Sequence, residues 1–284
     1  MIKFGVAGNS QAFYDEGHKH TIEAAAWCKQ KGLDVFEYSF GKGVRMTEET
    51  ARNIGAAFAE QDVELSAHAP YYINFANLDD DKITGSIGYV IQTLEKVKSF
   101  GCASRAVVHP AAQGKATRED AVERTNRNLR LLADAVYELG FDDKKVCLET
   151  MGKLGQIGTV EEIVSFCKIA PFFYPCIDFG HINARTRGSL KSTEDYERII
   201  DYMLDNLPEE KVMHMHVHFS KIMYGAAGEI KHLTFEDDVY GPDFEPLCEV
   251  LIKNKLEPVI ICESDGTQAR DAAIMKSIYY SHFN

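Results

Sequence analysis

Side chains that can bind metal ions recur at the ends of short apolar segments along the whole sequence. Six consecutive segments end in such residues: His68, His109, Glu149, Asp178 with His181, His216 with His218, and Glu263. A single histidine of this kind is more often a hydrogen-bonded core or surface residue than a ligand. Several imidazoles and carboxylates in one pocket, however, would be costly to bury without cations. Nitrogen and oxygen donors in this mixture suit Zn²⁺, our first choice, or Mn²⁺.

The elements that would position these residues alternate between strand and helix patterns. Apolar, β-branched strands are predicted at residues 2–7, 34–39, 64–69, 105–109, 146–150, 175–179, 212–219 and 258–263. Helix patterns follow them at residues 17–31, 47–60, 80–100, 117–140, 159–169, 192–206, 243–254 and 267–282. Thr47 and Thr159 are typical helix N-caps, and Gly101 and Gly140 are typical C-caps. The pattern predicts an α/β fold, a (β/α)8 TIM barrel forming a single domain over residues 1–284, with a doubly wound open sheet as the alternative.

A barrel would gather the candidate ligands, because the C-terminal ends of all its strands meet at one mouth. The longest irregular stretches, residues 180–191 and 221–239, directly follow predicted strands and would lie at the same mouth. In the seventh strand, His214, His216 and His218 share one face because side chains alternate along a strand. Any of these three histidines could point into the mouth.

Composition narrows the classes of protein to consider. No apolar run approaches the roughly 20 residues that span a bilayer, and the N-terminus does not resemble a signal peptide, so we expect a cytoplasmic protein without membrane contact. The seven cysteines form no CxxC pair and are interpreted as reduced core thiols. The formal net charge of -12 argues against nonspecific coating of nucleic acid. A local basic rim remains compatible with this charge, and clustered metal ions would add positive charge.

Several short motifs, in chain order, resemble those of endonuclease IV, a family of abasic-site DNA repair nucleases among the xylose-isomerase-like TIM barrels. They are His68-Ala-Pro-Tyr71-Tyr-Ile-Asn74, His109-Pro110, Glu149-Thr-Met-Gly152, Asp178-Phe-Gly-His181, the run from His216 to Lys221, and Glu263-Ser264. The resemblance extends over the whole chain. It implies hydrolysis of DNA 5′ to abasic sites, by in-line attack of an activated water without a covalent intermediate.

The resemblance also implies two or three metals and assigns their ligands. His68, His109 and a bridging Glu149 would hold the first metal. Glu149, Asp178, a seventh-strand histidine and Glu263 would hold the second. His218 is favoured for that position because the residues after it best match the family's strand end, with His216 as the alternative. Glu149 and Glu263 would be the catalytic residues.

The third metal would be held by His181 and His232. The family places an aspartate two residues before its second histidine, but Ile230 stands there in this chain. Glu229 is the nearest carboxylate and is the candidate replacement.

The resemblance makes double-stranded DNA with abasic sites the expected partner of a monomeric enzyme. Tyr71 falls where the family places a tyrosine beside the DNA, and an aromatic ring can stack in the gap left by a missing base. Arg185 and Lys221 are predicted substrate-binding residues among the cations that follow the strands: Lys42, Arg45, Lys115, Lys153, Arg185, Arg187, Lys191, Lys221 and Lys231. The loop at residues 39–45 lacks the polar pattern expected of a DNA-reading loop.

Two other classes of function fit part of this pattern. A sugar isomerase or epimerase of the same superfamily needs one Mn²⁺ or Mg²⁺, and Glu149, Asp178, the seventh-strand histidine and Glu263 would suffice for it. The further histidines at neighbouring strand ends favour the phosphodiesterase. A noncatalytic protein that binds metal or sugar phosphate is the third class, since a fold does not fix a function.

Overall fold

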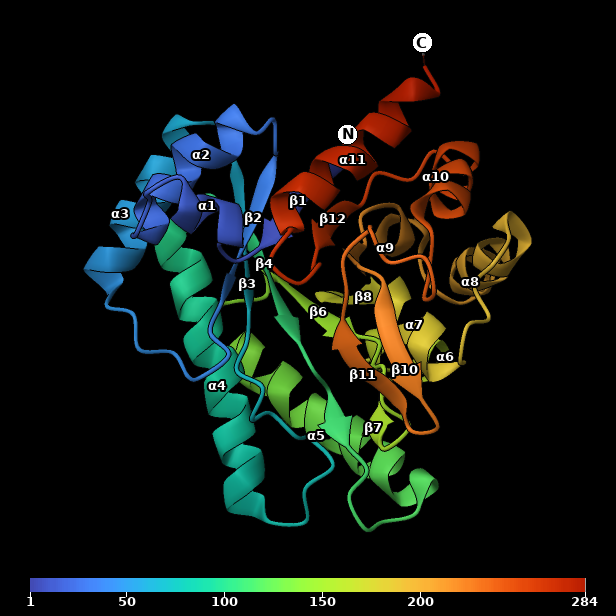
Figure 1. Cartoon of the computed structure of the whole chain (residues 1–284). Helices are drawn as coiled ribbons and strands as arrows, with labels where there is room; N and C mark the ends of the chain where they lie inside the picture. Colours follow the sequence, from blue (N-terminus) through green and yellow to red (C-terminus); the bar gives the residue numbers. More distant parts are fainter. Residues whose placement is uncertain (284) are drawn as a thin grey trace.

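The computed structural model describes residues 1–283, and eight parallel strands close into a barrel in it (Figure 1). Around the barrel the strands run in the order β1-β12-β9-β8-β6-β4-β3-β2. Their bounds are β1 (Lys3–Ala7), β2 (Val35–Ser39), β3 (Glu64–His68), β4 (Ala103–Val108), β6 (Lys145–Glu149), β8 (Phe173–Asp178), β9 (His216–Phe219) and β12 (Val259–Cys262). The predicted (β/α)8 architecture is confirmed.

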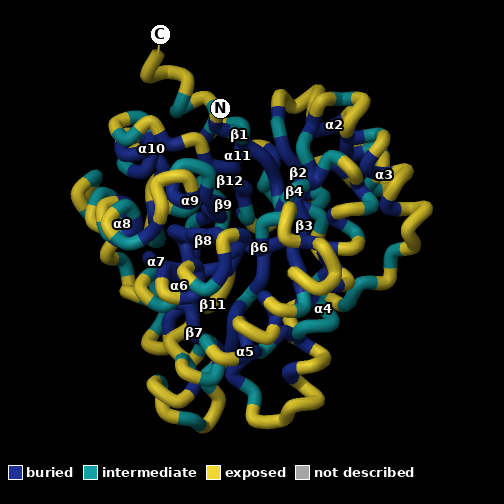
Figure 2. Tube along the Cα trace, turned by 180° about the vertical axis from the view of Figure 1, so that it is seen from behind, coloured by how far each residue is buried: buried dark blue, intermediate teal, exposed yellow. Residues whose placement is uncertain are grey.

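Helices surround the strands and bury their apolar faces against them. The helices are α1 (Gln11–Asp15), α2 (Ala24–Gln30), α3 (Glu48–Glu60), α4 (Asp80–Phe100), α5 (Arg118–Glu138), α6 (Val160–Cys167), α7 (Phe179–Arg185), α8 (Thr193–Asn206), α9 (Glu209–Met213), α10 (Phe244–Lys253) and α11 (Gln268–Ser281), with a 3-10 turn, η1 (Thr21–Glu23). Figure 2 shows the strands buried and the outer surfaces of the helices exposed. The main core lies between the two layers, and smaller apolar clusters fill the barrel interior.

Local capping explains why several helices begin and end where the sequence predicts. The side-chain oxygen of Thr47 accepts a hydrogen bond from the backbone N–H of Thr50 at the start of α3. Thr159 and Glu162 form a reciprocal capping box at the start of α6. Gly101 ends α4 with a φ of 74°, a conformation that a residue with a Cβ rarely adopts. These contacts fix the lengths of the helices and so the positions of the next strands.

Two predicted elements were wrong in part. The helix expected at residues 17–31 is shorter and consists of η1 and α2 over residues 21–30, while a separate helix, α1, precedes it and is followed by Gly17 with a φ of 91°. The strand expected at residues 212–219 begins only at His216, because residues 209–213 form α9 after Pro208. A proline followed by two glutamates is typical of a helix start. His214 is therefore the C-cap of α9 and does not lie in the barrel strand.

The two stretches expected to be irregular contain regular structure. Residues 179–185 form α7, and residues 222–232 form an antiparallel hairpin of β10 (Ile222–Gly225) and β11 (Gly228–His232). The hairpin, orange in Figure 1, stands outside the barrel sheet. It contacts the segment after β6, where Glu229 N–H donates to Gly152 O and Leu154 N–H donates to Ala227 O. The short strands β5 (Ala111–Ala112) and β7 (Gln156–Ile157) pair beside it.

No helix within residues 1–283 has both the length and the apolar character needed to cross a membrane. All seven cysteines are free, and six of them are buried. Burial raises the pKa of these thiols, for example to about 12 at Cys28 and Cys262. This state agrees with the expected reduced core thiols.

Candidate metal centre

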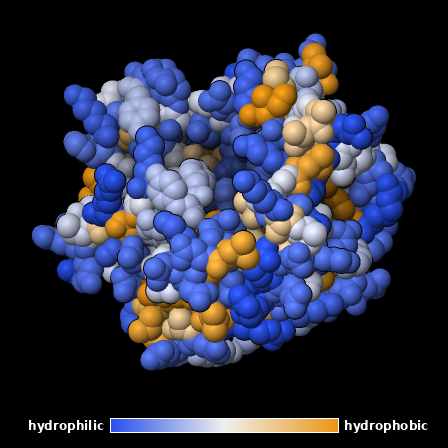
Figure 3. All heavy atoms as spheres, turned by 90° about the horizontal axis from the view of Figure 1, so that it is seen from below, coloured by the Kyte–Doolittle hydropathy of each residue, from blue (hydrophilic) through white to orange (hydrophobic). Residues whose placement is uncertain are grey.

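The candidate ligands gather in a cavity of about 320 Å³ at the C-terminal ends of the barrel strands. Figure 3 shows the molecule from below, where the surface is mostly hydrophilic and is hollowed near its middle. The residues that line the cavity are His68, Tyr71, His109, Glu149, Met151, Lys153, Gln156, His181, Glu229, His232 and Glu263. The barrel thus places side chains from opposite ends of the sequence around one space.

Glu149, the last residue of β6, lies at the centre of this arrangement. Its Oε2 lies 3.2 Å from Nε2 of His68 and 3.0 Å from Nε2 of His109. Its Oε1 lies 3.3 Å from Nδ1 of His181 and 3.3 Å from Nδ1 of His218. The two oxygens of one buried carboxylate therefore face different sets of imidazoles. This is the arrangement that a ligand shared between two cations requires.

A second donor group combines Glu149 with Asp178, His218 and Glu263, whose ligand atoms all lie within 4.8 Å of one another. Asp178 caps α7, because its Oδ1 accepts a hydrogen bond of 2.7 Å from His181 N–H. Its Oδ2 is fully buried, accepts no hydrogen bond in the described part of the chain and has one charged neighbour there, His181, whose Nδ1 lies 3.1 Å away. A buried carboxylate oxygen in this state is costly unless a cation compensates it. The buried oxygen without a hydrogen bond and the mixed nitrogen and oxygen donors both fit a divalent metal such as zinc.

A third donor group consists of His181, Glu229 and His232. Glu229 Oε2 lies 3.5 Å from His181 Nε2, and Glu229 Oε1 lies 3.9 Å from His232 Nε2. The register of the hairpin shifts here, because Met223 pairs with Lys231 whereas Tyr224 pairs with Glu229. Ile230 is the extra residue of this bulge and is 57% exposed. The bulge brings Glu229 to the position where the resemblance implies a carboxylate.

Three of these histidines are oriented by a hydrogen bond between Nδ1 of the ring and a neutral acceptor. Nδ1 of His68 lies 2.8 Å from Ala69 O, and Nδ1 of His181 lies 2.9 Å from Thr150 O. Nδ1 of His232 lies 2.8 Å from Ser220 Oγ. A proton on each Nδ1 would leave the lone pair of each Nε2 for a metal, which is the usual arrangement of histidine ligands.

The electrostatics of the cavity show strong coupling between these groups. Burial alone would raise the pKa of Glu149, but the imidazoles of His109 and His218 hold it well below its usual value. Burial opposes protonation of His181, yet Asp178 and Glu149 raise its pKa to about 10. Without metals, protons therefore balance the carboxylates, and metal cations would have to displace those protons.

Other predicted site residues have different surroundings. Tyr71 is 58% exposed and borders the cavity, with its ring centroid 5.2 Å from His68 and 5.4 Å from His109. Arg185 donates hydrogen bonds to backbone carbonyl groups of residues 151–156, among them a bond of 2.7 Å to Lys153 O. Lys221 donates to Asp237 O and lies 3.1 Å from Asp243. Both predicted phosphate-binding side chains are thus occupied within the protein, and the structure does not favour that role for them.

The structure also distinguishes His216 from His218. His218 lies directly behind the cavity lining, within the donor group of Glu149, Asp178 and Glu263, whereas His216 groups only with His218 and with Cys176 on the neighbouring strand β8. His216 Nε2 lies 2.9 Å from Oε2 of Glu37, a residue of β2 that the sequence analysis did not single out. The only available signal was an acidic residue inside an apolar strand pattern. Burial lowers the pKa of His216 to about 4, which makes it a neutral imidazole.

Residues 25–279 match the family described as the xylose isomerase-like TIM barrel, and the chain therefore belongs to this family. An uncharacterized protein of Methanocaldococcus jannaschii is 30% identical over 278 residues, which cover 97% of this chain and 96% of that protein. A probable endonuclease 4 of Mycoplasma mycoides subsp. mycoides is 24% identical over 203 residues, covering 66% of this chain and 67% of that protein.

Solved structures with a similar fold include several sugar epimerases. The structure of 3-keto-D-glucoside 4-epimerase from E. coli matches with a TM-score of 0.69 and 16% identity, covering 99% of this chain and 100% of that one. At this identity the similarity establishes the fold alone. The comparisons confirm the predicted superfamily, which is one of enzymes, and leave the reaction to be argued from the site.

Proposed function

We propose that the protein is a metal-dependent phosphodiesterase that cleaves DNA on the 5′ side of abasic sites. One observation carries the proposal: Glu149 presents its two oxygens to separate sets of imidazoles, and a further donor group adjoins them on the hairpin. Two or three neighbouring cations suit phosphodiester hydrolysis, since they can stabilise both the attacking and the leaving oxygen. Zn²⁺ is the preferred ion for the imidazole-rich groups, with Mn²⁺ as the alternative.

Glu149, Glu263 and Tyr71 would have different roles in this reaction. Glu149 would hold two cations at a fixed separation, because its carboxylate is buried and contacted on both sides. Glu263 lies at the end of β12 with 18% of its side chain exposed, so it can both bind a cation and accept a proton from the attacking water. Tyr71 stands at the rim of the cavity, where its exposed ring can stack on a base next to the gap.

Binding of a polyanion is supported by a cavity of about 930 Å³ on the far side of Tyr71. Lys19, Lys42 and Arg45 line it, and none of its described lining residues is acidic. Lys42 and Arg45 take part in no ion pair within residues 1–283. A local basic surface of this kind can bind phosphates even though the formal net charge is -12.

A duplex carrying one abasic analogue tests the proposal directly. The zinc-loaded protein should nick the damaged strand 5′ to the analogue and leave the intact duplex uncut. Glu263→Gln should reduce the rate by about 10²- to 10³-fold or more, as expected for the loss of one electrostatic group at a reaction centre. Glu257→Gln is the matched control, because Glu257 precedes the same strand at the opposite end of the barrel. Full nicking by Glu263→Gln would refute the assigned role.

The alternative is a one-metal sugar epimerase or isomerase, for which Glu149, Asp178, His218 and Glu263 would suffice. Elemental analysis of protein purified without chelator separates the two. Two or three zinc ions per chain support the phosphodiesterase. A single Mn²⁺ or Mg²⁺, together with exchange of a sugar carbon-bound proton for deuterium, would replace it with the epimerase. Metal-loaded protein that acts on neither substrate class would indicate a binding protein.

A further inference from the structure

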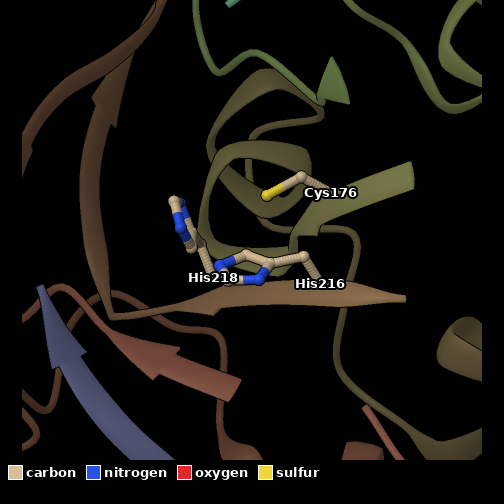
Figure 4. Close-up of side chains that lie close together, drawn as sticks. All are labelled: Cys176, His216 and His218. Atoms are coloured by element: carbon tan, nitrogen blue, oxygen red, sulfur yellow. The ribbon is translucent and has the colours of Figure 1, made fainter. Parts of the chain in front are cut away.

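Within residues 1–283, His218 is the one histidine that belongs to two candidate donor groups. Its Nδ1 lies 3.3 Å from Glu149 Oε1 and 3.5 Å from Glu263 Oε1, on the cavity side. The imidazole also forms a second, deeper group with Cys176 and His216. Figure 4 shows His216 and His218 on β9 with Cys176 on the neighbouring strand. The surroundings of His218 must therefore fix which ring nitrogen carries the proton, and so which of the two donor groups the other nitrogen can join as a ligand.

Glu37 lies on the deeper side of His218. Its Oε1 lies 3.0 Å from His218 Nε2, and its Oε2 lies 2.9 Å from His216 Nε2. Ser66 Oγ donates a hydrogen bond of 2.8 Å to Oε2. Glu37 is 1% exposed and His218 is fully buried, so water cannot take the place of this carboxylate. Within residues 1–283, Glu37 Oε1 and His218 Nε2 form no hydrogen bond of good geometry with any group, so their 3.0 Å contact is an ion pair between two buried atoms that otherwise have no polar partner.

The other three oriented histidines have weaker acceptors in the same role. Nδ1 of His68 and Nδ1 of His181 each meet a backbone carbonyl, and Nδ1 of His232 meets a hydroxyl group. Nδ1 of His181 also lies 3.1 Å from Asp178 Oδ2 and 3.3 Å from Glu149 Oε1, but those two carboxylates are themselves candidate ligands. The carboxylate beside Nε2 of His218 is that of Glu37, which belongs to none of the donor groups found in residues 1–283. A carboxylate that accepts the distal N–H of an imidazole fixes its tautomer and makes the opposite nitrogen a stronger metal ligand.

We propose that Glu37 is a positioning residue that keeps the proton of His218 on Nε2 and thereby commits Nδ1 to the metal group of Glu149, Asp178 and Glu263. The inference rests on the metal centre proposed above. It also explains why the deeper group is a poor metal site. With Nε2 protonated and turned toward Glu37, His218 has no lone pair to offer to Cys176 and His216.

The substitution Glu37→Gln is the central test, because glutamine keeps the length of the side chain but has one acceptor oxygen for two histidines. Binding of Co²⁺ to protein stripped of metal, followed by visible absorption and competition with a chelator, reports the affinity without any substrate. Glu37→Gln should weaken binding by about 10- to 100-fold, the usual effect of losing the partner of a metal-bound histidine. Unchanged affinity would overturn the inference.

Two matched variants separate this role from general damage to the barrel interior. His216→Gln leaves the contact between Glu37 and His218 intact and should retain the Co²⁺ affinity. Cys176→Ser changes another buried side chain beside His216 and should also leave the Co²⁺ affinity unchanged. An equal loss in His216→Gln would mean that Glu37 does not act through His218. Sulfur-to-cobalt charge-transfer absorption that disappears in Cys176→Ser would place the metal in the deeper group and would also overturn the inference.

A structural readout completes the test. Nitrogen–proton correlation spectra of the zinc-loaded protein should show His218 protonated at Nε2, and protonation at Nδ1 would contradict the inference. If Glu37→Gln does not fold, as judged by circular dichroism of the metal-free chain, Glu37→Asp takes its place and should also weaken binding. These outcomes are independent of the proposed reaction. Wild-type protein that binds Co²⁺ but cleaves no DNA would refute the phosphodiesterase and leave the role of Glu37 standing.

Discussion

Substitution of a carboxylate that belongs to two donor groups should remove more bound metal ions than substitution of a carboxylate that belongs to one. Glu149 belongs to two of the three donor groups of the cavity, whereas Glu229 belongs only to the group on the hairpin. Glu149→Gln should therefore remove two metals and leave at most one. Glu229→Gln should remove one and leave two. Both variants replace an anionic oxygen by a neutral amide of similar size, so they differ mainly in how many groups lose a ligand.

Activity should follow the same order. The loss of Glu149 removes the ligand that fixes two cations together, and we expect a rate at least about 10³-fold below the wild type, at or beyond the upper end for a single electrostatic group. Glu229→Gln leaves the two groups joined by Glu149 intact, so its rate should fall less. The assay is elemental analysis of protein stripped and reloaded with zinc, paired with cleavage of the abasic duplex. Circular dichroism of the metal-free variants confirms that each remains folded.

Two results would refute this reasoning. Equal loss of metal in the two variants would mean that Glu149 is not shared. Retention of two or more zinc ions by Glu149→Gln would mean that the imidazoles hold the metals without the carboxylate.

Three further predictions concern pH, stability and substrate contact. The pKa of His181 is raised to about 10 in the folded protein, from about 6.5 in the unfolded chain. The stability that His181 contributes to the metal-free protein should therefore be complete below about pH 6.5 and be lost as the pH rises through about 10, while metal affinity rises over the same range. Melting curves and metal titrations at several pH values check both trends. Lys211 is 6% exposed and donates to Cys167 O, Ala170 O and Phe173 O, so Lys211→Met should lower the free energy of unfolding by about 3 kcal/mol in urea, because carbonyls left without a partner cost about 1–3 kcal/mol each. Tyr71→Ala should weaken binding of the abasic duplex by roughly 5- to 150-fold in a fluorescence titration, because stacking on a base contributes about 1–3 kcal/mol; unchanged binding would exclude stacking.

The sequence predicted best those features that depend on neighbours along the chain. The helix pattern at residues 80–100 coincides with α4, because Asp79 and Gly101 cap it on either side. The convergence of the candidate ligands followed from strand order, since the ends of parallel strands in a barrel share one mouth. Neither inference needed any knowledge of contacts between distant residues.

The features that were missed depend on contacts across the fold. Glu37 looks like an ordinary strand residue, and its imidazole partners lie about 180 positions away in the chain. The position of Glu229 beside His181 and His232 depends on a bulge in the hairpin, in which Ile230 is the extra residue. The beginning of β9 was placed too early because histidine and apolar residues alternate over residues 213–218, and this period-2 pattern together with Val212 concealed the end of a short helix.

The hairpin of β10 and β11 gives the third donor group a different status from the other two. Its two strands form a separate two-stranded sheet, and neither strand pairs with a strand of the barrel. Shortening it would remove Glu229 and His232 while every hydrogen bond between the barrel strands stays in place. A change confined to this hairpin could therefore reduce the number of metal ions that the site binds. The barrel that carries the remaining ligands would not have to change.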